Sequence, residues 1–167
     1  RGRVEASIDA LGYRTSSTFD GVGNLVSVIN ALGYLTTYQY DAVNRQLSKV
    51  DALGNRTSFA YDAAGRFASL TNPLGNKTTR VYDGASQQIA TIDALGNRAT
   101  NVFDEAGRQT AQVNPLGERS TIVYDAVSDP TAQIDGLGNR TTMVYDDARR
   151  LIAALNPLGN RATRVYD

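Results

Sequence analysis

The stretch DALGNRTSFAYDAAGR (Asp51–Arg66) is repeated in outline along the whole chain. Leu-Gly occurs eight times, Tyr-Asp or Phe-Asp occurs eight times, and both series advance by 21 residues. The first series is Leu11, Gly12, Leu32, Gly33, Leu53, Gly54, Leu74, Gly75, Leu95, Gly96, Leu116, Gly117, Leu137, Gly138, Leu158 and Gly159. The second is Phe19, Asp20, Tyr40, Asp41, Tyr61, Asp62, Tyr82, Asp83, Phe103, Asp104, Tyr124, Asp125, Tyr145, Asp146, Tyr166 and Asp167. A fixed internal period indicates a tandem-repeat architecture.

Each unit begins at the Asp or Asn that precedes Leu-Gly. The units start at Asp9, Asn30, Asp51, Asn72, Asp93, Asn114, Asp135 and Asn156. Residues 1–8 resemble the second half of a preceding unit, because GRVEASI at the start is similar to GRFASLT (Gly65–Thr71). We therefore expect residues 1–167 to form a single array of stacked repeats that is a window of a longer one.

Two turn signals divide every unit. The first is DALG or NPLG, in which Asp or Asn is followed three residues later by Gly. This is the pattern of a type I turn, where the side-chain oxygen of the first residue accepts a backbone N–H and Pro presets φ at the second position. The second signal is YDAAGR (Tyr61–Arg66) and its equivalents, although Asn44, Ser86, Ser128 and Arg149 replace the Gly in four units.

The segments between the turns are predicted to be strands. One run is rich in Thr, Val and Tyr, as in RTTMVY (Arg140–Tyr145), and the other is more mixed, as in QQIATI (Gln87–Ile92). Runs of about six β-branched and aromatic residues bounded by Gly, Pro, Asn and Asp are typical of strands and too short for free-standing helices. The predicted fold is all-β, with units stacked into a continuous twisted sheet, tube or solenoid-like shell.

Alternation along the strands assigns side chains to faces. We expect the nearly constant aromatic and Leu columns to face a shared interior. The residue two before the aromatic differs in every neighbouring unit, as in Tyr38, Phe59 and Asn101, so we expect it to face solvent or a loosely packed lumen. The pattern alone leaves open which face of the sheet is the dry one.

A second period of 42 residues overlies the first. Asp and Asn alternate strictly at the start of the units, and Pro follows only Asn, at Pro73, Pro115 and Pro157. One interpretation is duplication of a two-unit block. The other is a two-unit structural cell, which predicts that the Asp turns and the Asn turns lie on separate lines in different environments.

Composition excludes several chemistries. The 167 residues contain 17 basic and 17 acidic residues, so no electrostatic footprint for nucleic acid is present. No apolar run approaches the ~20 residues of a membrane-spanning helix, so no membrane insertion is expected of this segment. The chain has no Cys and no His, which removes thiol chemistry, the usual zinc ligands and the base of a catalytic triad. We expect no catalytic residue, no metal site, no cofactor and no enzymatic activity.

The repeated polar and aromatic columns have structural explanations beside functional ones. A constant Asp at the start of a turn is explained by its hydrogen bonds to the turn backbone, with calcium as the alternative. An Arg column favours local ion pairing over an anionic polymer, and a Tyr column favours packing over the stacking of sugars. Three Asn-x-Thr sequons, at Asn55, Asn76 and Asn139, are possible glycosylation sites if the protein is secreted.

The unit resembles the YD repeat of the RHS (rearrangement hot spot) family, which combines Gly, Tyr-x-Tyr-Asp, Gly-Arg and an aliphatic residue. The stretches that carry the resemblance include GYLTTYQYDAVNRQL (Gly33–Leu47), GNRTSFAYDAAGRFA (Gly54–Ala68) and GNRATNVFDEAGRQT (Gly96–Thr110). Relatives in this family build β-sheets that spiral into hollow shells, among them toxin-complex cocoons, bacterial RHS shells and the teneurin barrel. The resemblance implies secretion or display at the cell surface, and an encapsulating or adhesive role.

The leading hypothesis is a non-enzymatic structural segment that stacks on neighbouring repeats or copies of itself into an extracellular β-tube, fibre or shell. One alternative is part of an RHS shell that encloses a toxin. Another is a cell-surface adhesion or carbohydrate-binding β-barrel, whose partners would be surface glycans.

Overall fold

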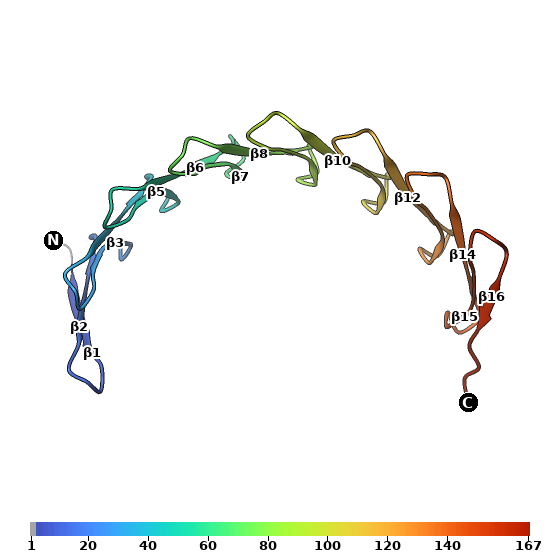
Figure 1. Cartoon of the computed structure of the whole chain (residues 1–167), viewed down its shortest axis with the longest axis horizontal. Coiled ribbons are helices and arrows are strands. Elements are labelled where there is room, and N and C mark those ends of the chain that lie inside the picture. Colours follow the sequence, from blue (N-terminus) through green and yellow to red (C-terminus); the bar gives the residue numbers. More distant parts are fainter. Residues whose placement is uncertain (1–2) are drawn as a thin grey trace. The chain divides into compact units, whose positions relative to one another are not determined.

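The computed structural model describes residues 3–167, which form sixteen β-strands and no helix (Figure 1). The strands are β1 Val4–Ile8, β2 Arg14–Phe19, β3 Leu25–Ile29, β4 Leu35–Tyr40, β5 Gln46–Val50, β6 Arg56–Tyr61, β7 Phe67–Thr71, β8 Lys77–Tyr82, β9 Gln88–Ile92, β10 Arg98–Phe103, β11 Gln109–Val113, β12 Arg119–Tyr124, β13 Pro130–Ile134, β14 Arg140–Tyr145, β15 Leu151–Leu155 and β16 Arg161–Thr163. The predicted strand at Arg140–Tyr145 is found with the same bounds, and Gln87–Ile92 differs from β9 by one residue. The all-β prediction is confirmed.

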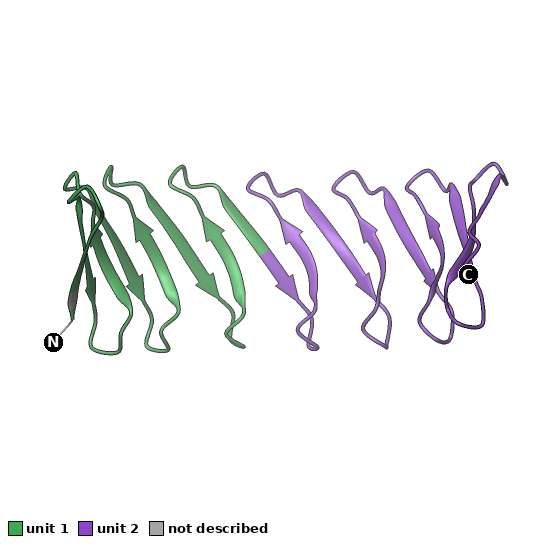
Figure 2. Ribbon diagram, turned by 90° about the horizontal axis from the view of Figure 1, so that it is seen from below, with its two compact units in different colours: residues 1–79 green, residues 80–167 purple. Residues whose placement is uncertain are grey.

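The strands form one open antiparallel sheet in which the hydrogen-bonded order follows the chain from β1 to β16. Each strand is joined to the next by a short turn, so the topology is a meander without crossovers. The chain divides into two compact units, Arg1–Thr79 (unit 1) and Arg80–Asp167 (unit 2). In each unit the turns lie in two rows, one at each end of the strands (Figure 2). We call them the Leu-Gly row and the YD row after the residue pairs that they contain, and we use the word edge for these two rows of strand ends.

Each unit is a single layer of strands, and its interior is one narrow column of small side chains. Of the residues that the structure describes, those that are buried occupy the third position of successive odd-numbered strands. They are Ser48, Ser69, Ala90, Ala111, Ala132 and Ala153. A single layer cannot bury large side chains between sheets, so its driest positions are small residues that their neighbours can cover.

Neighbouring side chains cover this column from both adjacent strands. Ala132 of β13 lies opposite Val123 of β12 and Thr142 of β14, and Ala111 of β11 has the equivalent partners. Directly opposed residues share a face of the sheet. The dry face is therefore the one that carries Arg, Ser or Thr, and Val on the even-numbered strands, which the sequence left open.

The expected position of the Leu column in the interior is wrong. All eight Leu side chains of the Leu-Gly pairs are exposed, with exposed fractions from 76% at Leu32 to 87% at Leu95. The reason is local, because Leu occupies the third position of a turn that begins after the strand has ended. The side chain there projects beyond the edge of the sheet rather than onto either face.

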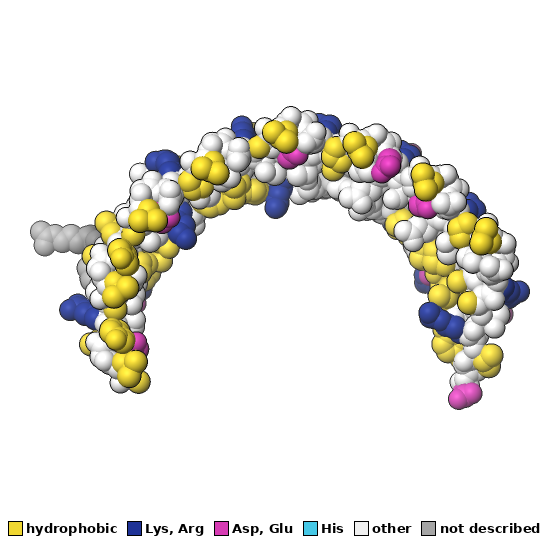
Figure 3. Space-filling model, in the orientation of Figure 1, with side chains coloured by type: hydrophobic (Ala, Val, Ile, Leu, Met, Phe, Trp, Pro, Cys, Tyr) yellow, Lys and Arg dark blue, Asp and Glu magenta, His cyan; other side chains and the backbone are white. Residues whose placement is uncertain are grey.

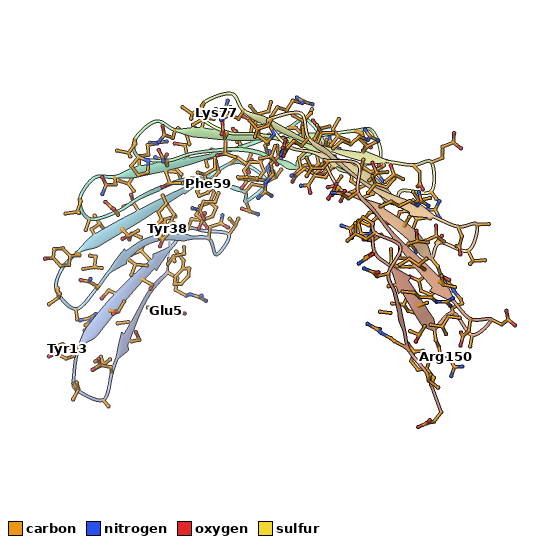
Figure 4. All side chains as sticks on the ribbon, turned by 45° about the vertical axis from the view of Figure 1, so that its right-hand side comes forward. Glu5, Tyr13, Tyr38, Phe59, Lys77 and Arg150 are labelled. Carbon is orange, nitrogen blue, oxygen red and sulfur yellow. The ribbon has the colours of Figure 1, made fainter. Side chains whose placement is uncertain are left out.

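The residue two before the aromatic lies on the other face, where most of these side chains are half-buried, although Arg80 and Arg164 are exposed. In unit 1 this face carries the aromatic side chains of Tyr38 on β4 and Phe59 on β6 (Figure 4). The ring centroids of Phe59 and Phe67 are 6.3 Å apart, and Phe67 meets the edge of Tyr61 at 6.1 Å. In unit 2 the same face carries amides, and Asn101 donates from Nδ2 to the carbonyl oxygen of Gln88 at 2.9 Å.

Candidate functional site

Both rows of turns use the same backbone geometry. In the Leu-Gly row the N–H of Gly54 donates to the carbonyl of Asp51 at 3.0 Å, and in the YD row the N–H of Gly65 donates to the carbonyl of Asp62 at 2.9 Å. The two glycines have φ of 83° and 81°. A type I turn followed by a left-handed residue is a common connection of antiparallel strands, and the left-handed residue is usually Gly. The turn prediction is confirmed.

The first residue of each turn caps it with its side chain. Asp51 Oδ1 accepts the backbone N–H groups of Leu53 and Asn55, both at 2.9 Å. Asn72 Oδ1 accepts the equivalent N–H groups of Leu74 and Asn76 at 3.0 and 2.9 Å. Asp turns and Asn turns thus alternate along one edge with the same capping bonds. The hypothesis of separate lines for the two kinds of turn is wrong.

Asp and Asn differ in what the second side-chain atom does. Asp51 Oδ2 accepts a further hydrogen bond from Asn55 Nδ2 at 2.9 Å, and Asp93 and Asp135 do the same with Asn97 and Asn139. These bonds lower the pKa of Asp51, chiefly through the Asn55 side chain and then its backbone N–H. Of the three sequon residues, Asn55 and Asn139 therefore use Nδ2 within the turn.

The YD row adds contacts that reach from one repeat to the next. Asp41 caps its turn, and its Oδ2 accepts Arg45 Nε at 2.7 Å. The Arg45 guanidinium lies over the ring of Tyr61 in the following repeat, 4.6 Å from the ring centroid. The hydroxyl of Tyr61 donates to the carbonyl oxygen of Gln46 at 3.0 Å. Tyr61 is thus held from two directions by the end of the preceding YD turn.

This Asp–Arg–Tyr linkage recurs in both units. Arg108 Nε donates to Asp104 Oδ2 at 2.7 Å, and its guanidinium lies 4.8 Å from the ring centroid of Tyr124. The Tyr124 hydroxyl donates to the carbonyl oxygen of Gln109 at 3.2 Å. Arg3 over Phe19 and Arg150 over Tyr166 repeat the cation–ring contact. A cation over an aromatic face contributes about 0.5–1 kcal/mol at exposed sites.

A β-bulge lies opposite the aromatic residue, in the strand that follows it. The register shifts between Ala60 and Tyr61 where β6 pairs with β7, and between Val123 and Tyr124 where β12 pairs with β13. A bulge bends the strand locally and redirects a side chain.

Where Arg is replaced, other polar pairs connect consecutive YD turns. Asn24 Nδ2 donates to Asn44 Oδ1 at 2.8 Å. Asp129 instead accepts two hydrogen bonds from the guanidinium of Arg149 in the following YD turn, at 2.6 and 2.9 Å. The two partners of each pair are 20 residues apart in the sequence. Residues at this spacing come into contact only through the register of the sheet. Apart from the replaced Gly, no feature of the sequence predicts these pairs.

Two capping carboxylates of the YD row, Asp41 and Asp62, have lowered pKa values. The pKa of Asp41 is lowered chiefly by the backbone N–H of Arg45; burial opposes this effect, and the Arg45 side chain lowers the pKa further. The Arg66 side chain, followed by its backbone N–H, lowers the pKa of Asp62. Carboxylates held in the ionised form accept hydrogen bonds and do not act as acids near neutral pH. The Asp residues of both rows serve as turn caps.

No group of three or more potential metal-ligating side chains occurs among residues 3–167. Within the same range no helix is long and apolar enough to cross a membrane. A hollow of about 570 Å³ lies on the apolar face of unit 1. Val26, Tyr38 and Leu47 line it together with residues of two YD turns.

Fold and linkage together define a tandem-repeat β-sheet protein whose repeats are joined through Tyr, Asp and Arg. The family model for the RHS repeat matches residues 19–51, 40–77, 61–99 and 124–161. The chain belongs to the RHS repeat family, as the sequence resemblance indicated. A comparison with curated proteins found no match.

Solved structures with the same fold come from toxin complexes. The Photorhabdus luminescens Tc holotoxin pore matches with a TM-score of 0.67 at 17% identity, over 90% of this chain. A TcdB2-TccC3-Cdc42 crystal structure matches with a TM-score of 0.59 at 18% identity, over 93% of this chain. A TcdB2-TccC3 crystal structure matches with a TM-score of 0.58 at 18% identity, over 90% of this chain. In each case this chain spans 9% of the matched chain, so the likeness concerns the fold of one segment.

Proposed function

We propose that this chain is a wall segment: a non-enzymatic length of single-layered β-sheet that builds a tube, fibre or shell by repetition. The observation that carries the proposal is the Asp–Arg–Tyr linkage, in which the constant residues of one repeat hold the next repeat. A repeat that contacts its neighbours in this way adds cohesion with each copy.

Three features of the capping carboxylates support a structural role over catalysis. Asp62 shows all three: its carboxylate accepts backbone N–H groups, it pairs with Arg66, and its pKa is lowered. General acid catalysis near neutral pH needs the opposite displacement.

Among the possible walls, we favour a shell that lies outside the cell and encloses a polypeptide. The toxin-complex structures share the fold, and the two faces of the sheet differ in a way that suits an enclosure. On the dry face every even-numbered strand holds Ser or Thr at its third position, whereas the other face changes from aromatic in unit 1 to amide-rich in unit 2. A surface that need not fit a fixed neighbour is free to vary, as expected for a wall facing varied contents.

Electron microscopy of the native protein tests the wall proposal. We expect hollow particles or tubes whose wall is one sheet thick, about 10 Å. Solid globular particles without a sheet-like wall would contradict it. Protease treatment then distinguishes a shell from a fibre. A polypeptide enclosed in intact shells should survive the protease and should be cut after the shells are opened by acid. A fibre should protect no polypeptide.

A further inference from the structure

The Leu residues of the Leu-Gly row are largely exposed, so burial within residues 3–167 does not explain their constancy. In unit 1 they are Leu11, Leu32, Leu53 and Leu74, with exposed fractions of 82%, 76%, 83% and 85%. Apolar side chains recur along the surface of the unit (Figure 3). Exposed apolar residues that repeat in a row mark an interaction surface more often than isolated ones do.

The YD row provides an internal control for what the turn itself requires. Its turns have the same backbone bonds and the same Asp cap, and Ala64 N donates to Asp62 Oδ1 at 3.0 Å as Leu53 N donates to Asp51 Oδ1 at 2.9 Å. At the position of Leu, however, the YD row holds Val22, Val43 and Ala64. The turn therefore accepts any of these residues, and Leu is retained for a contact beyond the turn.

The Leu-Gly row of unit 1 also contains hollows between consecutive turns. One is lined by Ser7, Asp9, Tyr13, Thr15, Ala31 and Leu32, and the next by Tyr34, Asp51, Ala52 and Leu53. Each has a volume of about 370 Å³. Tyr13 and Tyr34, with exposed fractions of 56% and 55%, replace the Asn found in most other turns of this row. Each hollow is thus bordered by one Leu of the row and by one Tyr.

The period of this edge limits what can occupy it. Adjacent strands are about 4.8 Å apart, so one two-strand repeat advances about 10 Å. A partner that fills successive hollows must present apolar side chains at that same interval. The Leu residues of a second copy of this chain do so.

We propose that two copies of this chain associate through the Leu-Gly row of unit 1, with the Leu side chains of each copy seated in the hollows of the other. The contact is isologous, because the same edge supplies both projections and hollows. An exposed Leu offers on the order of 100 Å² of apolar surface. The four Leu residues together with Ile8, Tyr13, Tyr34 and Leu35 approach the roughly 800 Å² per partner of a standard interface.

Sedimentation equilibrium of the full chain over a range of concentrations tests the proposal. The variant Leu32→Asp/Leu53→Asp places charges in the contact, and Val22→Asp/Val43→Asp places them at the same turn position in the YD row. Val22 and Val43 are 74% and 66% exposed, so both variants are expected to fold, which circular dichroism checks. We expect a dimer whose dissociation constant rises by more than about tenfold in the Leu variant and stays unchanged in the Val variant.

Cross-linking locates the contact independently, because the chain contains no Cys. A short thiol-specific cross-linker should join two copies of Leu32→Cys/Leu53→Cys and should not join Val22→Cys/Val43→Cys. Three results would overturn the proposal: a monomer at every concentration, equal weakening by both charge variants, or association that the Leu variant leaves intact. The last result would indicate pairing through a strand edge such as β1, which would leave the proposed wall function standing.

Discussion

The two rows of turns share one backbone design and differ in what lies around them. Asp62 and Asp51 cap their turns with bonds of nearly equal length. In the YD row, Arg45 and Tyr61 and their equivalents then connect consecutive repeats, whereas in the Leu-Gly row the Leu side chains project away from the sheet. The conformation of a turn therefore does not determine its tertiary contacts. The same type of turn holds repeats together in the YD row and leaves the Leu side chains exposed in the Leu-Gly row.

This comparison predicts that equivalent substitutions will destabilise the fold more in the YD row than in the Leu-Gly row. The first test is Arg108→Ala against Arg98→Ala. Arg108 contacts Asp104, the ring of Tyr124 and Ser128 Oγ at 2.9 Å. Its loss should lower the free energy of unfolding by about 2 kcal/mol, the sum of a cation–ring contact and partly exposed hydrogen bonds.

Arg98 begins β10 at the Leu-Gly edge and is exposed, so its replacement should change stability by less than about 0.5 kcal/mol. Urea unfolding followed by circular dichroism measures both variants. Equal effects of the two substitutions would show that the Asp–Arg–Tyr linkage does not hold the repeats together.

The second test compares Gly65→Ala with Gly54→Ala. Both glycines have φ near 80°, a conformation that costs an L residue about 1–2 kcal/mol. A Cβ at Gly54 would meet open space, whereas one at Gly65 would lie 3.2 Å from Arg45 Nη1. Gly65→Ala should therefore lower the free energy of unfolding more than Gly54→Ala, because Arg45 must shift from its place over Tyr61.

Other YD turns carry a side chain at the position of Gly65, and they suggest a further variant for this test. Asn44 and Ser86 adopt φ of 65° and 66° there, so a side chain can be accommodated where it bonds to its neighbours. Gly65→Asn should accordingly recover part of the stability that Gly65→Ala loses. Thermal unfolding of the three variants compares them directly, and identical melting temperatures for Gly65→Ala and Gly54→Ala would refute the role of Arg45.

The sequence predicted the fold because its turn signals are explicit. Asp or Asn, Gly and the 21-residue period specify where each strand ends, and Arg140–Tyr145 was found with its predicted bounds. The direction in which each side chain points was harder to predict. Leu53 is apolar, which suggests burial, yet its position within the turn sends it outward.

The linkage between repeats could not be read from spacing alone. Arg45 and Tyr61 are 16 positions apart, and they meet because β5 and β6 pair in one register. The buried column of small side chains was equally hard to predict from the sequence. Taken as single residues, Ser48 and Ala111 resemble neither core residues nor site residues.

A third test removes one hydroxyl from each edge, with Tyr145→Phe against Tyr34→Phe. The Tyr145 hydroxyl donates to the carbonyl oxygen of Pro130 at 3.0 Å in a half-buried position, so its loss should cost about 1 kcal/mol. Tyr34 is 55% exposed in the Leu-Gly row, and its hydroxyl should contribute almost nothing. Urea midpoints at equal slope measure the difference, and a costly Tyr34→Phe would show that the Leu-Gly edge has an internal structural role.

The smallest effect is expected for Asp51→Asn, compared with Asp104→Asn. Asn30 and Asn72 already hold the same turn, so Asp51→Asn should preserve both capping bonds and lose only the acceptor for Asn55 Nδ2. Asp104→Asn also keeps a capping oxygen, but the charged partner of Arg108 is lost. Near neutral pH the Asp104 variant should therefore melt at the lower temperature.

Acid separates the same pair by titration. The pKa of Asp104 is lowered, first by the backbone N–H of Arg108 and then by its side chain, and the pKa of Asp51 is lowered mainly by the Asn55 side chain. A carboxylate whose pKa is lower in the folded state stabilises the fold above its ordinary pKa of 3.8, and this contribution is lost as the pH falls through the folded value. Each Asn variant lacks one such group, so the melting temperatures of wild type and variants should converge as the pH is lowered below about 3.8. The melting temperature of Asp104→Asn should move further toward that of wild type than the melting temperature of Asp51→Asn does. The reason is that Asp104→Asn differs more from wild type at neutral pH. A gap that stays constant down to the lowest pH would show that the ionised carboxylate is not what holds Arg108 against the next repeat.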